Sequence, residues 1–409
     1  MTLLTVTKRK LWVSILIGLM IFYSLGTGFA FFFRLLYAII ITIGIGLVWA
    51  WFNLKGLEIH LNRTIWHGQV GDFLGGELQI VNHYRLPKSW ISVKEISTIP
   101  GYTSGRAIGL VKNQRRSWLI EHQLAVRGKY LCGEIEVISQ DPFGLFQLRR
   151  SFLSSREFTV FPRTELLPDL SPQLSNLPSD AKSTHRSDHI TTDSATIRTY
   201  RSGDSPRRIH WPYTAKMNNL MVKEFEAGVS AESWVVMDMH NQSHVGEDPI
   251  DNSEELAVTV ASSLINKLTS LSIPVGLTAN SDSYYKFRPD RNTAHMQNIM
   301  QSLASIRANG RIRLSHFIYD LEHQLNRFSS LIVITPSTRT DWIDALAFLK
   351  SKGIKVSAIY INPSGFNSSS ESNQTIQTLL ENEILSYVVH KNQPINECLK
   401  YPIQTLLNP

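Results

Sequence analysis

Cysteine is nearly absent from this sequence. Only Cys132 and Cys398 occur among 409 residues, and they stand far apart. Two distant cysteines build no disulfide framework and show none of the paired spacing of zinc sites. We expect both to be small buried residues in a protein that is kept in a reducing compartment.

Motifs of common catalytic sites are missing as well. The chain has no glycine-rich phosphate loop ending in Lys-Ser or Lys-Thr, and no Gly-x-Ser-x-Gly turn. His185 and His189 have no third ligand nearby in the sequence, which argues against zinc. The net charge of +7 is modest, and attraction to anionic lipid headgroups explains it as well as a nucleic-acid role would. We therefore expect no catalytic residues, no cofactor and no nucleic-acid partner.

Charged residues are also absent from two long stretches near the N-terminus. Only Arg34 separates the uncharged runs 11–33 and 35–54. About 20 helical residues span the ~30 Å hydrocarbon core of a bilayer. A turn at residues 26–28 gives two helices, about 11–27 and 31–53, and brings Arg34 close to the far interface. A single long helix would place Arg34 in mid-bilayer, at a cost of about 2.5–3.5 kcal/mol. We therefore predict a transmembrane helical hairpin within residues 1–55.

The basic residues around the hairpin predict its orientation. Lys8, Arg9 and Lys10 precede the first helix, and Lys55 and Arg63 follow the second. Because positive residues favour the cytoplasmic side, we expect a multi-pass protein of the cytoplasmic membrane with cytoplasmic soluble domains. A cleaved signal peptide is the alternative. The apolar run is longer than a typical signal sequence, however, and a second run follows at once.

Apolar residues alternate with period two between residues 56 and 165. Leu57, Ile59 and Leu61 alternate with polar residues, as do Leu78 and Ile80. Short alternating runs punctuated by glycine are typical of half-buried strands, so we predict an all-β sandwich domain over 56–165.

One turn motif stands out in this domain. Asp141, Pro142, Phe143 and Gly144 have the residue types of a type I turn, with Asp at the first, Pro at the second and Gly at the fourth position. A partner-docking corner is the functional interpretation. Turn chemistry alone favours a structural turn capped by Asp141.

The period changes after a linker. Residues 166–195 are rich in Ser, Pro, Asp and Thr and lack periodicity. From 196 to 409, short apolar runs at 234–239, 274–279, 331–335, 356–361 and 385–389 predict strands. Helical patterns follow Ser253, the expected N-cap, cover 295–307 and 315–327, and begin again at Asp341. Alternating strands and helices predict a doubly wound α/β domain with a parallel sheet.

Residues 198–226 form a distinctive basic block. It contains Tyr200, Arg201, Gly203, Asp204, Arg207, Arg208, Trp211 and Lys216. Asp204 can fix the loop by pairing with one arginine, Trp211 can anchor it in the core, and the other arginines can face an acidic partner or lipid phosphates. An internal ion-pair network that joins the two domains is the alternative.

This block resembles that of the bacterial family called domain of unknown function 58. The family carries a Tyr…Gly-Asp…Arg…Trp block, followed by an Ala-Lys or Ala-Arg pair and a strand. The membrane helices, the strand-rich domain, the Arg127-Gly128 pair, the Asp-Pro-Phe-Gly corner and the 160–162 segment occur here in the family's order. The resemblance therefore covers nearly the whole chain.

The resemblance implies more than the residues alone. The family's C-terminal half looks like a von Willebrand factor A domain, and its members occur alongside MoxR-type AAA+ ATPases. Such A domains often hold Mg²⁺ through Asp-x-Ser-x-Ser after the first strand. The matching stretch here starts at Asp238 but lacks both serines, so we expect a degenerate site without metal. Asp238 is then expected to cap a neighbouring loop.

We therefore predict a membrane-anchored, non-enzymatic adaptor. Its expected partners are the lipid bilayer and a protein, with a MoxR-type ATPase suspected, in protein maturation or an envelope-related process. The alternative is a metal-dependent adhesion or ligand-binding module on the outer membrane face, which needs the opposite topology and a working cation site. A hydrolase is disfavoured because no nucleophile–base pair is visible.

Overall fold

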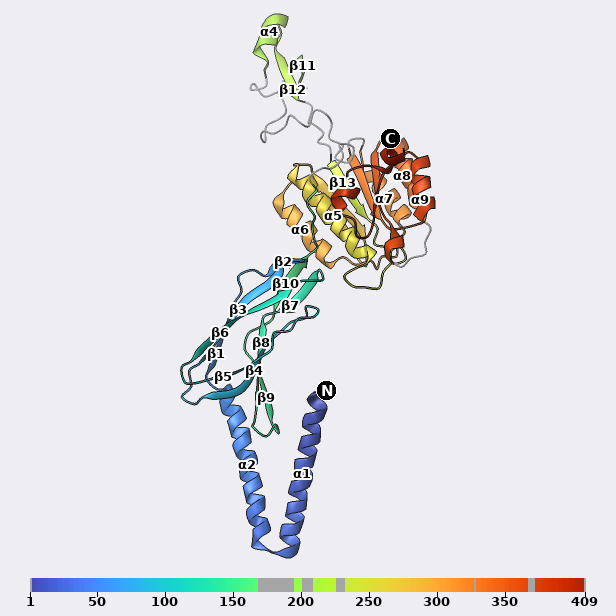
Figure 1. Cartoon of the computed structure of the whole chain (residues 1–409). Helices are drawn as coiled ribbons and strands as arrows, with labels where there is room; N and C mark the ends of the chain where they lie inside the picture. The colour runs from blue at the N-terminus through green and yellow to red at the C-terminus, as the bar shows by residue number, and fades with distance from the viewer. Residues whose placement is uncertain are drawn as a thin grey trace. The chain divides into compact units, whose positions relative to one another are not determined.

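The computed structural model describes residues 2–167, 195–200, 209–225, 232–326, 329–366 and 372–407. The chain divides into two compact units, Met1–Pro162 and Arg163–Pro409 (Figure 1). The boundary falls at the end of the strand-rich region. The predicted linker 166–195 lies almost entirely outside the described residues.

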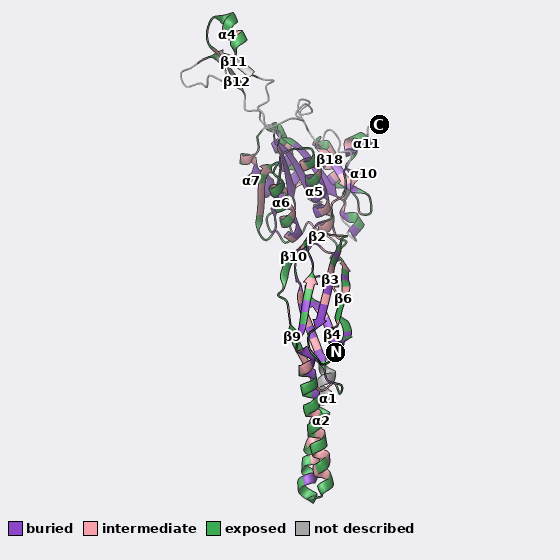
Figure 2. Ribbon diagram, turned by 90° about the vertical axis from the view of Figure 1, so that its left-hand side faces the viewer, coloured by how far each residue is buried: buried purple, intermediate pink, exposed green. Residues whose placement is uncertain are grey.

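Two antiparallel helices open the first unit. Helix α1 (Thr2–Thr27) and helix α2 (Ala30–Leu54) contact each other and are joined at Gly28, whose φ of +67° suits glycine. Helix α2 is long and apolar enough to cross a membrane, with a mean hydropathy of 2.3, and Figure 2 shows both helices largely exposed. The apolar part of α1, Leu11–Thr27, is shorter. The structure thus supports one potential membrane-spanning helix near the N-terminus, and a second crossing stays a prediction.

Strands build the rest of the first unit. They are β1 (Leu57–Asn62), β2 (His67–Gln69), β3 (Phe73–Asn82), β4 (Lys88–Ile96), β5 (Arg106–Leu110), β6 (Arg115–Gln123), β7 (Gly128–Cys132), β8 (Glu134–Gln140), β9 (Gln147–Ser151) and β10 (Arg156–Phe161). They form sheets of order β1-β3-β6, β5-β4-β8-β9 and β2-β10-β7. Only the β2–β10 pair is parallel among these described strands. The region is β-rich, as predicted, with mixed sheets.

The first two sheets share a core. Ile59, Leu78 and Ile80 from one sheet pack with Ile91 and Val137 from the other. These residues are the buried half of each alternating pattern, which explains why the period of two appears in the sequence.

A buried ion pair crosses this unit. Both guanidinium nitrogens of Arg63 donate to the Glu95 carboxylate, at 2.6 and 3.0 Å, and both side chains are almost fully buried. The Gly133 N–H and the Tyr102 hydroxyl also donate to Glu95. The charge of Glu95 is therefore fully hydrogen-bonded, which is the condition for keeping an ion pair in a core.

The block 198–226, called the family block below, forms a two-stranded hairpin and a short helix in its described residues. Strand β11 (Ala195–Thr199) pairs with β12 (Met221–Phe225), and helix α4 (Trp211–Met217) lies between them in sequence. The His210 N–H donates to the Met221 carbonyl, and the Met221 N–H donates to the Thr214 hydroxyl. These bonds fix α4 against β12.

The remainder of the second unit is a doubly wound α/β domain. Its strands are β13 (Glu232–Met237), β14 (Val275–Asn280), β15 (Tyr284–Asp290), β16 (Ser329–Thr335), β17 (Lys355–Ile361) and β18 (Leu385–Val389). Its helices are α5 (Ser253–Ser270), α6 (Thr293–Ser305), α7 (Leu314–Leu321), α8 (Asp341–Ser351), α9 (Ser372–Glu381), α10 (Ile395–Cys398) and α11 (Ile403–Leu407).

The sheet runs in the order β15-β14-β13-β16-β17-β18 and is parallel except for the edge strand β15. Val235 and Met237 of β13 pack with α5 and α6, whereas Trp234 and Val236 pack with α7 and α8. Apolar residues thus pack on both faces of the sheet, and Figure 2 shows its strands largely buried.

Two details correct the sequence analysis. Asn252, not Ser253, caps α5, because its side chain accepts from the Glu255 N–H at 2.8 Å. The buried Ser253 hydroxyl instead accepts from the Val245 N–H. The edge strand β15 was also not predicted, since its half-exposed residues lack a long apolar run.

Candidate functional site

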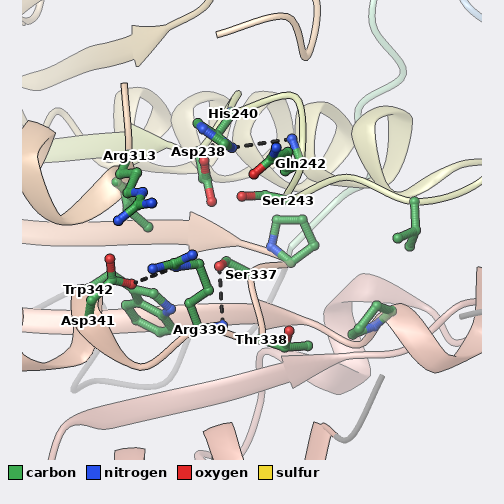
Figure 3. Close-up of a pocket in the computed structure, with 14 residues that line it drawn as sticks. Asp238, His240, Gln242, Ser243, Arg313, Ser337, Thr338, Arg339, Asp341 and Trp342 are labelled. Carbon is green, nitrogen blue, oxygen red and sulfur yellow. Dashed lines mark hydrogen bonds and ion pairs between the residues drawn. The ribbon is translucent and has the colours of Figure 1, made fainter. Parts of the chain in front are cut away.

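A pocket lies at the carboxyl ends of β13 and β16, where the chain connections leave in opposite directions across the sheet. It is lined by Asp238, His240, Gln242, Ser243, Val245, Arg313, Leu314, Pro336, Ser337, Thr338, Arg339, Asp341, Trp342 and Pro363 (Figure 3). Ligands of doubly wound sheets generally bind at such a switch point. The pocket is therefore the first place in this domain to look for binding.

Asp238 links two of the segments that line this pocket through hydrogen bonds. It is 3% exposed, and its carboxylate accepts from the Thr335 hydroxyl at 2.7 Å and from the His240 N–H at 3.0 Å. The Thr335 oxygen in turn accepts from the Ser337 N–H at 3.0 Å. Asp238 thus joins the loop after β13 to the loop after β16, and its buried charge is held by hydrogen bonds.

The side chains of this site offer a divalent cation few oxygen atoms that are not already hydrogen-bonded. Both oxygens of Asp238 already accept hydrogen bonds, and both oxygens of Asp341 do so too, from Ser315 and Arg339. Among the described residues no group of three His, Cys, Asp or Glu side chains stands ready for a metal. A hard divalent cation needs several free oxygen ligands.

Several of the side chains that line the pocket are hydrogen-bond donors. Arg313 and Arg339 both line it. The Nε atom of Arg339 lies 3.4 Å from the Asp341 carboxylate, and this ion pair is exposed to solvent. Trp342 is fully buried, and its indole N–H finds no acceptor among the described residues. A buried donor without a partner costs about 1–3 kcal/mol of free energy. A hydrogen bond from the Trp342 N–H to an acceptor that enters the pocket would offset this cost.

A glycine fixes the loop at the rim. Gly310 forms a bridge with His240, and its N–H donates to the Met239 carbonyl at 2.8 Å. A Cβ at position 310 would stand 2.2 Å from the Asn280 carbonyl oxygen. Only glycine permits this close approach of three backbone segments.

The structure places three residues of the family block. Tyr200 is half-buried, and its N–H donates to the Leu220 carbonyl at 2.8 Å. Lys216 is exposed in the last turn of α4. Arg201, Gly203, Asp204, Arg207 and Arg208 lie outside the described residues.

Trp211 is not the core anchor expected from the sequence. It is 65% exposed at the start of α4, and no residue of this helix is buried. Met217 and Leu220, near the end of the same segment, are also exposed. Among the described residues of this segment, α4 is accompanied by a two-stranded hairpin, and the ring of Trp211 lies at the surface.

The Asp-Pro-Phe-Gly corner is a closed turn. The Asp141 carboxylate accepts from the N–H groups of Phe143 and Phe146 at 3.0 and 2.6 Å. The Gly144 N–H donates to the Asp141 carbonyl at 3.0 Å. Gly144 has a φ of +68°, which explains a glycine at this position.

Residues 196–363 match the family model described as "Protein of unknown function DUF58". This match covers the block 198–226 and most of the α/β domain. The comparison with curated proteins finds no match.

Likenesses to solved structures are slight. The DNA glycosylase AlkC of Pseudomonas fluorescens is 16% identical over 26% of this chain and 30% of its own, with a TM-score of 0.19. A CARDB domain from Pyrococcus furiosus is 10% identical over 26% of this chain and 96% of its own, with a TM-score of 0.19. Trypsin-activated alpha-2-macroglobulin of Escherichia coli is 11% identical over 72% of this chain and 18% of its own, with a TM-score of 0.21. Scores this low carry no argument.

Proposed function

We propose that this chain, a member of the DUF58 family through residues 196–363, is a membrane-anchored adaptor that binds a protein partner and performs no chemistry of its own. Trp211 is the observation that carries the proposal. A tryptophan that is 65% exposed on a helix without any buried residue is unusual in a surface that only faces water. Tryptophan and arginine are the residues that dominate binding energy in protein interfaces.

The surroundings of Trp211 support the same role. Met217 and Leu220 add exposed apolar area, and Lys216 adds a positive charge beside them. The block around them is rich in arginine. Exposed apolar residues that lie close in sequence to basic ones suit a partner that presents apolar contacts together with acidic residues.

The α/β domain supports a von Willebrand factor A-like assignment, which is part of this proposal. Its central strands β13 and β16 flank the switch point, and its one antiparallel strand lies at the edge. The family resemblance implies the same domain and names a MoxR-type AAA+ ATPase as the partner to test first.

The pocket chemistry favours binding over catalysis. His240 Nδ1 accepts from the Gln242 N–H, and His244 bonds the Asp238 carbonyl oxygen. Neither imidazole bonds the Ser243 or Ser337 hydroxyl in any described hydrogen bond, so no activated nucleophile is assembled. The arginines and the unpaired Trp342 N–H suit capture of an acceptor group from the partner.

A direct binding measurement tests this function. The full-length chain in detergent is immobilised, and a purified MoxR-type ATPase from the same cells is passed over it with and without ATP. We expect Trp211→Ala to weaken binding at least tenfold, since hot-spot truncations cost about 2 kcal/mol or more. Tyr401→Ala removes another aromatic side chain, 55% exposed, and serves as the matched control. Equal binding by both variants would contradict the role of Trp211.

Topology belongs to the same proposal. The basic residues at both ends of the helical pair favour cytoplasmic soluble domains. Protease treatment of intact cells should leave the second unit uncut, whereas digestion would favour the outer-face ligand-binding alternative. Calorimetric titration with Mg²⁺ separates the two further, because the alternative requires a working cation site.

A further inference from the structure

Helix α2 is built into the β-rich domain rather than tethered to it. The Lys88 ammonium donates to the Phe52 carbonyl, and Arg150 donates to the Leu54 carbonyl at 3.4 Å. Asn53 and the backbone of Ser89 exchange two hydrogen bonds, at 3.0 and 3.4 Å. Cationic side chains thus satisfy carbonyls at the negative end of the helix, where the last turn has no partners of its own. The helix and the domain therefore keep a fixed geometry.

The corner 141–146 reaches down the side of this helix. A Cβ added to Gly46 would lie 3.4 Å from the Asp141 carboxylate, so the two backbones pass closely there. At 1.5 Å per residue, Gly46 lies about 12 Å below Leu54 along the helix. The β8–β9 hairpin consequently overlaps the end of a potential membrane span (Figure 1).

Apolar side chains point outward at this level. Trp51 is 46% exposed on α2, Phe143 is 53% exposed at the corner, and Trp90 is 83% exposed at the start of β4. Trp90 lies between Ser89, which bonds Asn53, and Ile91, which pairs with Ser139 of β8. Its φ of +58° accompanies a shift of strand register that turns the ring away from the core. We name Trp51, Trp90 and Phe143 the collar.

We propose that the collar inserts into the bilayer interface, so that the β-rich domain rests on the membrane surface instead of standing off from it. This inference rests on the proposed membrane anchoring by α2. Its 25 residues are about 37 Å long, which exceeds the ~30 Å hydrocarbon core by roughly the last turn and a half. That excess places Gly46 and Phe143 just inside the apolar boundary and Trp90 among the headgroups.

The chemistry of the corner fits that depth. The N–H groups of Asp141, Phe143, Gly144 and Phe146 are all bonded within the corner, and Pro142 has none. An irregular backbone near hydrocarbon is tolerated only when its polar groups are satisfied internally. Tryptophan is enriched where lipid meets water, which is the environment proposed for Trp51 and Trp90.

Basic residues lie close to the collar. The Lys55 ammonium lies 3.7 Å from the centre of the Trp51 ring. Arg85 and Arg149 are exposed and follow or precede collar residues by a few positions in the sequence, and Arg149 also pairs with Glu136 at 3.8 Å. Each basic residue close to an anionic bilayer contributes about 1 kcal/mol to its attraction. Continuity with α2 and these basic residues therefore point to lipid rather than to a protein.

The test places a fluorescent label at three positions of the full-length chain. The background is Cys398→Ser, because Cys132 is fully buried and resists labelling. Phe143→Cys reports the collar, Ile41→Cys reports α2, and Leu131→Cys is the matched control. Leu131 is 50% exposed on β7. The proteins are reconstituted into vesicles of three parts phosphatidylcholine and one part phosphatidylglycerol.

We expect the label at 143 to show blue-shifted emission, quenching by a spin label near the glycerol end of the acyl chain, and loss of quenching by aqueous iodide. The label at 131 should be quenched by iodide alone. If the label at position 41 is in lipid but the label at position 143 is quenched by iodide, the collar proposal is wrong and the proposed membrane anchoring by α2 is retained. If 41 is open to iodide as well, the membrane anchoring itself fails.

Discussion

Glu95 carries a charge at a position that water does not reach. Its carboxylate accepts hydrogen bonds from both terminal guanidinium nitrogens of Arg63. Burial, together with the hydrogen bond to Glu95, raises the pKa of Tyr102 above its usual range. Removing one partner leaves the other charge buried and unpaired. We predict that Glu95→Gln lowers the free energy of unfolding by about 3–5 kcal/mol.

The measurement is hydrogen exchange of strands β3 and β4 in the full-length chain. Glu157→Gln is the control, because Glu157 pairs with Lys129 across 3.5 Å at an exposed site. That change should alter stability by less than about 1 kcal/mol. Similar effects of both substitutions would show that the buried pair has no special weight.

The Cys132 thiol makes the free energy of unfolding of the first unit fall as the pH rises above 9. Burial raises the pKa of its thiol from 9.0 to about 11, so the unfolded chain loses this proton first. Stability is complete below pH 9 and declines as the pH rises toward 11, by up to about 2 kcal/mol. Denaturant unfolding followed against pH should show this decline in the natural chain.

Cys132→Ala removes this dependence and leaves that of Tyr102. The difference between the two chains therefore isolates the thiol. Parallel profiles from pH 9 to pH 11 would mean that the thiol ionises equally in both states.

At the scale of elements, the loop after β13 and the end of β14 meet Gly310 in one close approach. Gly310→Ala places a methyl group against the Asn280 and Met239 carbonyls. We predict a loss of about 1–3 kcal/mol or a displaced loop, as in other overpacked sites. Gly75→Ala is the control, since a Cβ there meets nothing within 4 Å. Thermal unfolding of the second unit reads out the first change, and no shift would contradict the geometry.

The stability of the corner 141–146 depends on the hydrogen bonds that the Asp141 carboxylate accepts. Asp141→Asn keeps one acceptor oxygen and loses the other, whereas Asp141→Ala loses both. We expect the alanine variant to be less stable by about 1–3 kcal/mol and the asparagine variant to lie between. Exchange of the Phe143 and Phe146 amides measures this order directly, and the reverse order would rule out capping by the carboxylate.

Elements with strong periodicity could be predicted from the sequence, and elements without it could not. The buried strand β16 contains the uninterrupted apolar run Leu331–Ile334, and β18 (Leu385–Val389), which is apolar except for Ser386, matches its predicted bounds. The strands β15 and β11 were missed, whereas a strand after the Ala215-Lys216 pair was implied by the family resemblance and corresponds to β12. Asp238 was found from its position after a strand, yet Arg313 and Trp342 were not. Arg313 precedes α7 and Trp342 lies at the start of α8, and only the folded sheet defines where these helices begin.

Trp211 illustrates the same limit for a single side chain. A tryptophan among arginines fits a buried anchor and an exposed contact equally well in sequence. The tertiary packing around it decides between them, and within the described part of this segment α4 is accompanied by the β11–β12 hairpin. Burial is a property of the tertiary structure, so no local pattern could give it.

At the scale of the whole molecule, helix α2 and the β-rich domain share one structural core. Leu54 is 7% exposed and packs with Leu57 and Ile91, and Ala50 is fully buried. The carbonyls of Phe52 and Leu54 hold Lys88 and Arg150. The natural boundary between the two parts therefore lies before residue 46 and not at residue 55, where the helix ends.

This boundary leads to a prediction about shortened chains. A chain that starts at Gly44 keeps the junction, whereas one that starts at Gly56 loses Leu54 from the core and leaves the buried Lys88 without its acceptor. Burial already lowers the pKa of Lys88, so the loss of the Phe52 carbonyl makes its charge still more costly. We expect the shorter chain to be less stable by about 2–5 kcal/mol, the cost of emptying one large core position. Denaturant unfolding of both chains, each in the same mild detergent, measures the difference. Equal stability would mean that the helix is only a tether, and the fixed geometry on which interfacial insertion depends would be lost with it.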